Sequence, residues 1–125
     1  MTRLIFDAYF LLLQVELTMA TRGLPALHRG VCKQGVATEI RSVAFDPEVL
    51  CQAMDWACVL YPKQVLCLQR SVATTLLLRR HGVSAGMFIG AQLLPFKSHA
   101  WVEVNGMVVN DKPYMRDIYR VLYHL

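Results

Sequence analysis

The chain has 125 residues, of which 55% are hydrophobic and only 18% are charged. This composition excludes an intrinsically disordered chain, which combines low hydrophobicity with high net charge. The length suits one small domain with its own core, so we expect a single domain over residues 1–125, divided into an N-terminal helix and loop (1–45) and a main body (46–125). The net charge is +4, but the Lys and Arg residues form no patch interleaved with aromatic residues, so we expect no nucleic-acid partner.

The first predicted element is an apolar helix from Leu4 to about Ala20, which ends at the helix-stopping sequence Arg22-Gly23-Leu24-Pro25. Its longest unbroken apolar run, Ala8 to Leu13, is shorter than the ~20 residues that cross a bilayer, so we expect no membrane span. The segment imitates a signal peptide, but Asp7 lies inside the apolar region and argues against one. We therefore expect a cytoplasmic protein whose first helix is either buried in the core or an interface for a partner.

Two more helices follow a loop that begins at Pro25. Asp46-Pro47-Glu48 supplies an N-cap, a proline at the first helical position and an acid in the first turn, so the second helix begins there and ends at about Leu60. The third helix is predicted from about Leu66 to His81 and closes at Gly82.

Beyond Gly82 the chain changes to short runs rich in Val, Ile, Phe and Trp, which predict the strands of an antiparallel sheet. These runs cover Ala85–Gly90, His99–Val104 and Met107–Asn110, and the apolar residues from Ile118 to Leu125 predict a short final helix. Helices first and strands second indicate an α+β fold, with N-terminal helices packed on a small antiparallel sheet. Phosphate-binding and dinucleotide-binding loops are absent from the sequence, so we expect no cofactor.

The four cysteines contain no Cys-x-x-Cys pair, so we expect reduced thiols and no metal site. Cys51 and Cys58 lie seven residues apart on one face of the second helix, which is typical of core residues. Cys32 falls in the loop. Cys67 lies at the start of the third helix, where free N–H groups and the helix dipole favour a thiolate, so it is the candidate nucleophile.

His99 begins a strand that leads into Asn105-Gly106, and the type of turn decides what faces it. A two-residue turn would send Asp111 to the side of the sheet opposite His99, whereas a three-residue loop with a bulge at Gly106 would pair His99 with Asp111. We predict the bulged turn. We also expect the third helix to cover this face of the sheet and so bring Cys67 towards His99.

These residues fit the roles of a cysteine hydrolase. Cys67 would attack, His99 would carry the proton and Asp111 would orient the imidazole. Trp101 would exclude water from the His–Asp pair, and the backbone N–H of Cys67 would stabilise an oxyanion, with Gln64 a candidate second donor. The alternative is that Trp101, His99 and Asp111 form an ordinary polar corner of the sheet.

Several motifs follow one another between roughly Asp46 and Leu125: Cys67-Leu68-Gln69-Arg70-Ser71, Leu77 to Gly82, Pro95-Phe96, His99-Ala100-Trp101-Val102-Glu103 and Val109-Asn110-Asp111. In this order they resemble the leader peptidases of lasso-peptide biosynthesis, which are transglutaminase-like, papain-related cysteine peptidases. The resemblance implies a catalytic core over 46–125 with a Cys67–His99–Asp111 triad. It also implies a ribosomally made precursor peptide as substrate, whose leader is removed before a separate ATP-dependent synthetase closes a macrolactam.

Fused members of this family carry an additional leader-recognition domain at the N-terminus. Because only about 45 residues precede the second helix here, we expect the stand-alone peptidase half, working with a separate leader-recognition protein and in the same pathway as the macrolactam synthetase. Two alternatives stay open: an acyltransferase that uses the same triad, and a non-catalytic adaptor that delivers the precursor. The segment from Ala91 to Ser98, just before His99, is predicted to be a loop and, with Pro95 and Phe96, is the candidate substrate wall.

Overall fold

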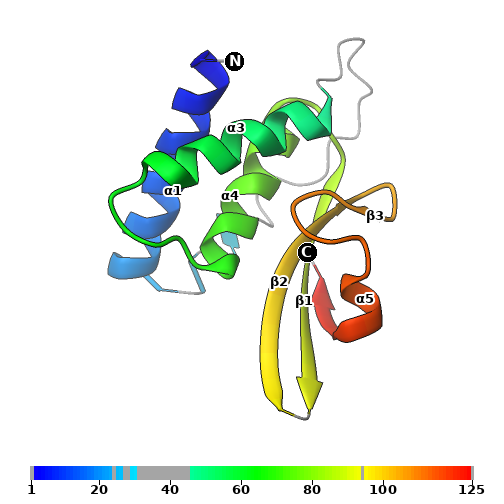
Figure 1. The fold of residues 1–125 in the computed structure, drawn as a ribbon. Coiled ribbons are helices and arrows are strands. Elements are labelled where there is room, and N and C mark those ends of the chain that lie inside the picture. The colour runs from blue at the N-terminus through cyan, green and yellow to red at the C-terminus, as the bar shows by residue number, and fades with distance from the viewer. Residues whose placement is uncertain (1, 24, 27–28, 31–45, 94, 125) are drawn as a thin grey trace.

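The computed structural model describes residues 2–23, 25–26, 29–30, 46–93 and 95–124, so Cys32 and most of the predicted first loop lie outside the described residues. Its helices are α1 (Thr2–Thr21), α3 (Pro47–Leu60), α4 (Cys67–Arg80) and α5 (Met115–Ile118), and its strands are β1 (Ala85–Leu93), β2 (Phe96–Val104), β3 (Met107–Val108) and β4 (Arg120–His124). Figure 1 shows α1, α3 and α4 gathered on one side of the sheet, whose strand order is β3-β2-β1-β4. The arrangement confirms the predicted α+β fold.

The ends of the two central helices follow the signals in the sequence. Asp46 caps α3 by accepting a hydrogen bond from the Glu48 N–H at 3.0 Å, and Pro47 occupies the first helical position. Helix α4 begins at Cys67 and ends at Arg80, and Gly82 follows it with a φ of 79°, the left-handed conformation that glycine adopts most easily. Both helices were therefore predicted to within one or two residues.

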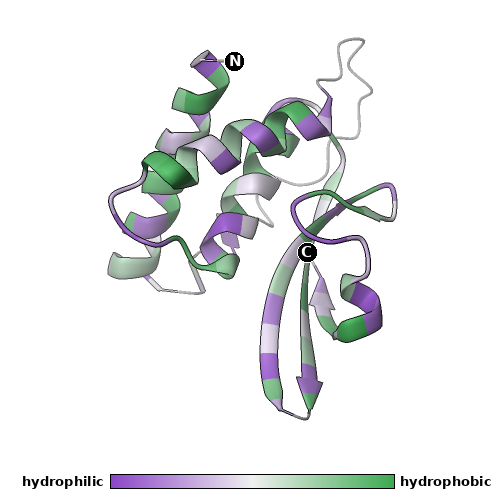
Figure 2. Cartoon of the chain, in the orientation of Figure 1, coloured by the Kyte–Doolittle hydropathy of each residue, from purple (hydrophilic) through white to green (hydrophobic). Residues whose placement is uncertain are grey.

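The hydrophobic core joins the three long helices to one face of the sheet. Figure 2 shows that the polar residues of β2 lie mostly in its outer half, while the half beside the helices is largely apolar. Burial of this apolar surface is the main favourable term in folding. The larger core side chains are Leu11, Leu12, Val15, Leu50, Met54, Val72, Leu77, Leu78, Met87, Val102 and Val104.

Helix α1 has two apolar faces. One contributes Ala8, Leu11, Leu12 and Val15 to the core. The other leaves a row of large apolar side chains exposed at helical spacing, namely Phe6, Phe10, Leu13 and Leu17. The short unbroken apolar run predicted no membrane span. The full length and composition of α1 do meet the requirements for one, although its inner face is packed in the core.

The β1–β2 hairpin is longer than predicted. The two strands pair without interruption from Ala85↔Val104 to Leu93↔Phe96, so the predicted loop over residues 91–98 is wrong and most of that segment is ladder. Residues 91–98 contain no glycine, and Pro95 lies between the two paired strands, where its missing N–H costs no ladder hydrogen bond. The hairpin therefore extends well beyond the helices (Figure 1).

The predicted final helix is also wrong. Helix α5 ends at Ile118, and the residues after Tyr119 form β4, which pairs antiparallel with β1 through Gly90↔Val121 and Ala91↔Arg120. The apolar residues there are compatible with either structure over so short a span. A strand forms here because the open edge of β1 supplies backbone hydrogen-bond partners that an isolated short helix would lack.

The turn after β2 differs from the prediction as well. Val104 pairs with Met107, and both Asn105 (φ 52°) and Gly106 (φ 79°) lie in the left-handed region, so the loop has two residues and no bulge. Asn-Gly is the dipeptide that this tight turn favours most strongly. The predicted three-residue loop is therefore wrong, and His99 and Asp111 are not partners in a ladder.

Strand β3 is short, and the side chain of Asn110 ends the ladder. Val109 N–H still donates to the Val102 carbonyl at 3.0 Å, but the Val102 N–H donates to the Asn110 side-chain oxygen at 2.7 Å rather than to a backbone carbonyl. The Asn110 amide in turn donates to the Ser71 hydroxyl on α4 at 3.2 Å. Asn110 thus ties the end of β3 to both β2 and α4, and the chain turns away from the sheet immediately afterwards.

The second face of the sheet carries a polar and aromatic cluster. Trp101 is completely buried but lies outside the helical core, and its indole N–H donates to Glu103 at 2.8 Å. Arg116 of α5 donates two hydrogen bonds to the Glu103 carboxylate, at 2.8 and 2.9 Å, and its guanidinium lies 4.8 Å from the centre of the Phe88 ring. The prediction that the third helix covers this face is wrong, because α4 packs on the alternate residues Val102 and Val104.

The Glu103 carboxylate makes stability depend on pH. Burial raises the pKa of Glu103, but the hydrogen bonds from Arg116 and Trp101 outweigh burial and hold the pKa below its ordinary value. A lowered pKa stabilises the fold above the unfolded value of about 4.3, and this contribution is lost as the pH falls through the folded-state pKa. We predict that urea midpoints of the wild type fall below about pH 4 and that Glu103→Gln shows a smaller fall. Asp7→Asn, a change at an exposed acid, is the control and is expected to follow the wild type.

Replacing Asn110 tests the tie between β2, β3 and α4. Asn110→Ala removes the acceptor of the Val102 N–H and is expected to lower the free energy of unfolding by about 1–3 kcal/mol, measured by urea denaturation. Asn110→Asp keeps the oxygen that accepts the Val102 N–H but loses the donor to Ser71. Its free energy of unfolding is expected to lie between those of the wild type and Asn110→Ala. Asn105→Gly, in the exposed turn, serves as the control; an Asn110→Ala variant as stable as this control would contradict the assignment.

Candidate active site

His99 and Asp111 form the central pair of the candidate site. His99 Nε2 lies 2.5 Å from Asp111 Oδ2, and both side chains are about a quarter exposed. The other carboxylate oxygen accepts the Lys112 N–H at 2.8 Å, which fixes the plane of the carboxylate. Because Nε2 is engaged by the carboxylate, Nδ1 is the nitrogen of His99 that can exchange a proton with another group.

The predicted pair is therefore present, although the predicted register that led to it is wrong. With the two-residue turn, a continued ladder would have placed Asp111 away from His99. The chain leaves the ladder at Asn110 instead, and this departure allows the next side chain to reach His99.

Two aromatic rings flank the His99 imidazole. Trp101 stacks near it with ring centres 6.3 Å apart, and Tyr119 lies closer, at 5.3 Å. Trp101 is completely buried beside His99, and its predicted role in shielding the pair from water stays a prediction. Tyr119 was missed, because the residues around it were predicted as a helix and nothing in their spacing points to His99.

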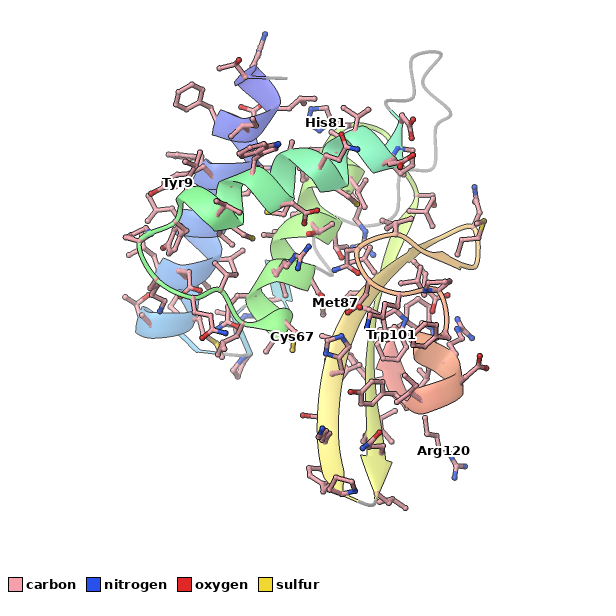
Figure 3. All side chains as sticks on the ribbon, in the orientation of Figure 1. Tyr9, Cys67, His81, Met87, Trp101 and Arg120 are labelled. Atoms are coloured by element: carbon pink, nitrogen blue, oxygen red, sulfur yellow. The ribbon has the colours of Figure 1, made fainter. Side chains whose placement is uncertain are left out.

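Cys67 is the first residue of α4, and its side chain is exposed. Figure 3 shows Cys67 at the end of α4 that lies beside β2. The preceding residue, Leu66, makes no side-chain capping hydrogen bond, so the first N–H groups of the helix are not capped by a side chain there. These features place an accessible thiol at the positive end of a helix.

The other described cysteines have the properties of core residues. Burial, and then the charge of Asp55, raises the pKa of Cys51 to about 11. Burial likewise raises the pKa of Cys58, which is half-buried against the core. Both thiols are therefore protonated at neutral pH, in agreement with their assignment from helical spacing.

The other site residues that were predicted from the sequence lie on exposed segments. Gln64 is exposed in the segment before α4, whereas Gln69 is buried within α4 and its side-chain oxygen has no hydrogen-bond partner among the described residues. Pro95 and Phe96 lie at the exposed tip of the hairpin, where Phe96 pairs with Leu93. Their predicted role as a substrate wall stays a prediction.

The candidate site contains an exposed thiol and an imidazole that is hydrogen-bonded to a carboxylate. Across the described residues, no three His, Cys, Asp or Glu side chains come together as metal ligands would. A thiol at a helix start, and an imidazole held by a carboxylate, are the parts that covalent acyl chemistry requires.

Comparison with known proteins identifies the family. The model of the transglutaminase-like superfamily matches residues 11–124, which is nearly the whole chain. The microcin J25-processing protein McjB of Escherichia coli is 47% identical over 51 residues, which make up 41% of this chain and 24% of McjB. The match to McjB confirms the resemblance to processing proteins that the motifs indicated.

The alignment with McjB spans about a quarter of the length of that protein. No solved structure matches the chain. The family match has a much wider extent: it begins within α1, includes α3 and α4, and ends in β4, so it contains every residue of the candidate site. On this evidence the chain belongs to the transglutaminase-like superfamily.

Proposed function

We propose that the chain is a cysteine peptidase that removes the leader from a ribosomally made lasso-peptide precursor before the macrolactam is closed. The hydrogen bond between His99 and Asp111, on the strand beside the helix that begins at Cys67, is the observation that carries this proposal. The similarity to a protein named for processing microcin J25 supports a role in peptide maturation. We place the reaction in the bacterial cytoplasm, where thiols stay reduced.

In the proposed reaction, His99 Nδ1 takes the proton of the Cys67 thiol and the sulfur attacks the carbonyl carbon of the scissile amide. The resulting tetrahedral oxyanion is stabilised by the backbone N–H of Cys67, with Gln64 as the candidate second donor. His99 then gives its proton to the leaving amine, which departs and leaves a thioester on Cys67. Water attacks the thioester and gives a proton to His99, which passes that proton to the departing sulfur, so that the Cys67 thiol is regenerated and a carboxylic acid is released.

The supporting groups act on His99. Asp111 holds Nε2 and thereby keeps Nδ1 available for the thiol, while the buried Trp101 limits the access of water to this hydrogen bond. The proposal requires Cys67 and His99 to meet beside the outer edge of β2, because the face of the sheet beneath α4 is occupied by Val102 and Val104.

The proposed partners are the precursor peptide, a separate leader-recognition protein and the macrolactam synthetase that uses the product. The exposed apolar row on α1 supplies a surface of the kind that protein partners cover. We assign Pro95 and Phe96, at the projecting tip of the hairpin, to the substrate wall.

Alkylation of the thiols tests the catalytic pair without any substrate. We predict that iodoacetamide at about pH 6 labels Cys67 far faster than Cys58 or Cys51, and that His99→Ala lowers the rate at Cys67 by about tenfold or more, as resolved by peptide mass. Cys51 is expected to stay unlabelled, because burial raises its pKa to about 11. His124→Ala, a change at an exposed histidine, is the control; equal rates at Cys67 in wild type and His99→Ala would refute the dyad.

Cleavage of the precursor tests the reaction itself. The wild-type chain, incubated with its precursor peptide and a separate leader-recognition protein, is expected to release the leader as a free acid, detected by mass. Cys67→Ala should abolish release while retaining binding, and Asp111→Asn should lower the rate by about 10²-fold or more. An amide-linked adduct instead of a free acid would indicate acyl transfer. Full function of Cys67→Ala in peptide maturation would indicate an adaptor.

A further inference from the structure

Two aromatic side chains, Trp101 and Tyr119, flank the imidazole of His99. The ring centres of His99 and Tyr119 are 5.3 Å apart, those of His99 and Trp101 are 6.3 Å apart, and those of Trp101 and Tyr119 are 6.1 Å apart. The planes of Trp101 and Tyr119 are inclined to the imidazole by 21° and 25°. The imidazole is therefore held by two neighbouring rings as well as by its hydrogen bond to Asp111.

The space for this cluster exists because residue 90 is a glycine. Gly90 is the cross-strand partner of His99 on β1. A Cβ atom at Gly90 would lie 2.8 and 2.9 Å from two carbons of the Trp101 ring and 2.9 Å from the Cβ of Tyr119, closer than atoms can pack. A larger residue here would therefore displace both rings that contact His99.

The two rings are fixed through a single ion pair. Glu103 accepts the indole N–H of Trp101, which sets the angle of that ring. The same carboxylate accepts both hydrogen bonds from Arg116, which anchors α5 to β2. Tyr119 follows α5 directly, and its N–H donates to the Met115 carbonyl at 2.9 Å, so anchoring α5 also places Tyr119.

The chemistry of the pair suits this task. The Glu103 side chain is almost fully buried, and a buried carboxylate is stable only when it is charge-paired and hydrogen-bonded. Arg116 meets it in a two-pronged arrangement that fixes direction as well as distance, which a lysine ammonium cannot reproduce. More than half of the Arg116 side chain remains exposed, so it can be replaced without opening the core.

We propose that Glu103 and Arg116, with Gly90, are positioning residues that hold the His99 imidazole for catalysis by fixing Trp101 and Tyr119. They act through these rings and do not themselves contact the reacting atoms. The inference rests on the proposed function, since it assigns a catalytic role to His99. Asp111 orients the His99 imidazole through a hydrogen bond to Nε2. The positioning residues add a second constraint, through the two rings that flank the imidazole.

The test compares two arginines of the same short segment. Arg116→Gln breaks the pair with Glu103, and Arg120→Gln removes the same charge from an exposed residue of β4 for which no side-chain contact is described. The double variant Glu103→Gln/Arg116→Gln leaves the net charge unchanged and still breaks the ion pair. NMR of the His99 ring protons, which neighbouring rings shift upfield, reports its orientation, and alkylation of Cys67 at about pH 6 reports its chemistry.

We expect Arg116→Gln and the double variant to move the His99 ring resonances towards the values of a free imidazole. We also expect them to lower Cys67 alkylation by about tenfold or more, because small displacements of a catalytic group are costly. Arg120→Gln should resemble the wild type in both measurements. Arg116→Lys should give His99 resonances and a Cys67 alkylation rate between those of the wild type and Arg116→Gln. His99 resonances and alkylation rates equal to those of Arg120→Gln in both broken-pair variants would overturn the proposal.

A second pair of variants tests the glycine. Gly90→Ala is expected to shift the His99 resonances in the same direction, whereas Gly30→Ala, where an added Cβ would meet no atom within 4 Å, should leave them unchanged. If Gly90→Ala fails to fold, the arginine variants still decide. Slow alkylation of wild-type Cys67 would count against the proposed function alone, because the His99 resonances test the positioning independently of any reaction.

Discussion

The point at which the chain leaves the sheet after β3 controls the geometry of the site. Asn110 ends the ladder by offering its side-chain oxygen to the Val102 N–H, and its amide reaches Ser71 on α4. Asp111 follows immediately and meets His99. A longer β3 would have carried Asp111 away from His99, since residues alternate between the faces of a strand. One asparagine therefore connects the helical layer, the sheet and the pair that we assign to catalysis.

The two faces of the sheet have different roles. The face beneath α1, α3 and α4 is apolar and supplies most of the buried surface on which folding depends. The opposite face carries Trp101 and Glu103, which α5 and Tyr119 contact. Because β2 contributes alternate residues to both, the helical core and the aromatic cluster share one rigid strand. A site built on such a strand holds its side chains more precisely than a site on loops does.

Membership of the transglutaminase-like superfamily agrees with acyl chemistry at a thiol, and the same thioester can be resolved by water or by an amine. The similarity to McjB favours peptide processing between these outcomes. Helix α1 adds a structural link to partners, because its inner face completes the core while its outer face presents Phe6, Phe10, Leu13 and Leu17. A partner bound to α1 would contact an element packed directly against the helix that begins at Cys67.

Features that depend on neighbouring residues could be predicted from the amino-acid sequence. The Asp46-Pro47 cap located α3, the position of Cys67 at a helix start was correct, and the motifs identified the family. The sequence also indicated His99 and Asp111, but through a bulged turn that does not form, because Asn105-Gly106 takes the tighter two-residue turn. The surroundings of His99 depend instead on contacts between distant parts of the chain. Pairing of β4 with the open edge of β1 brings together Gly90, Tyr119 and Arg116. Pairing between segments that are distant in the chain produces no local periodicity from which it could be predicted.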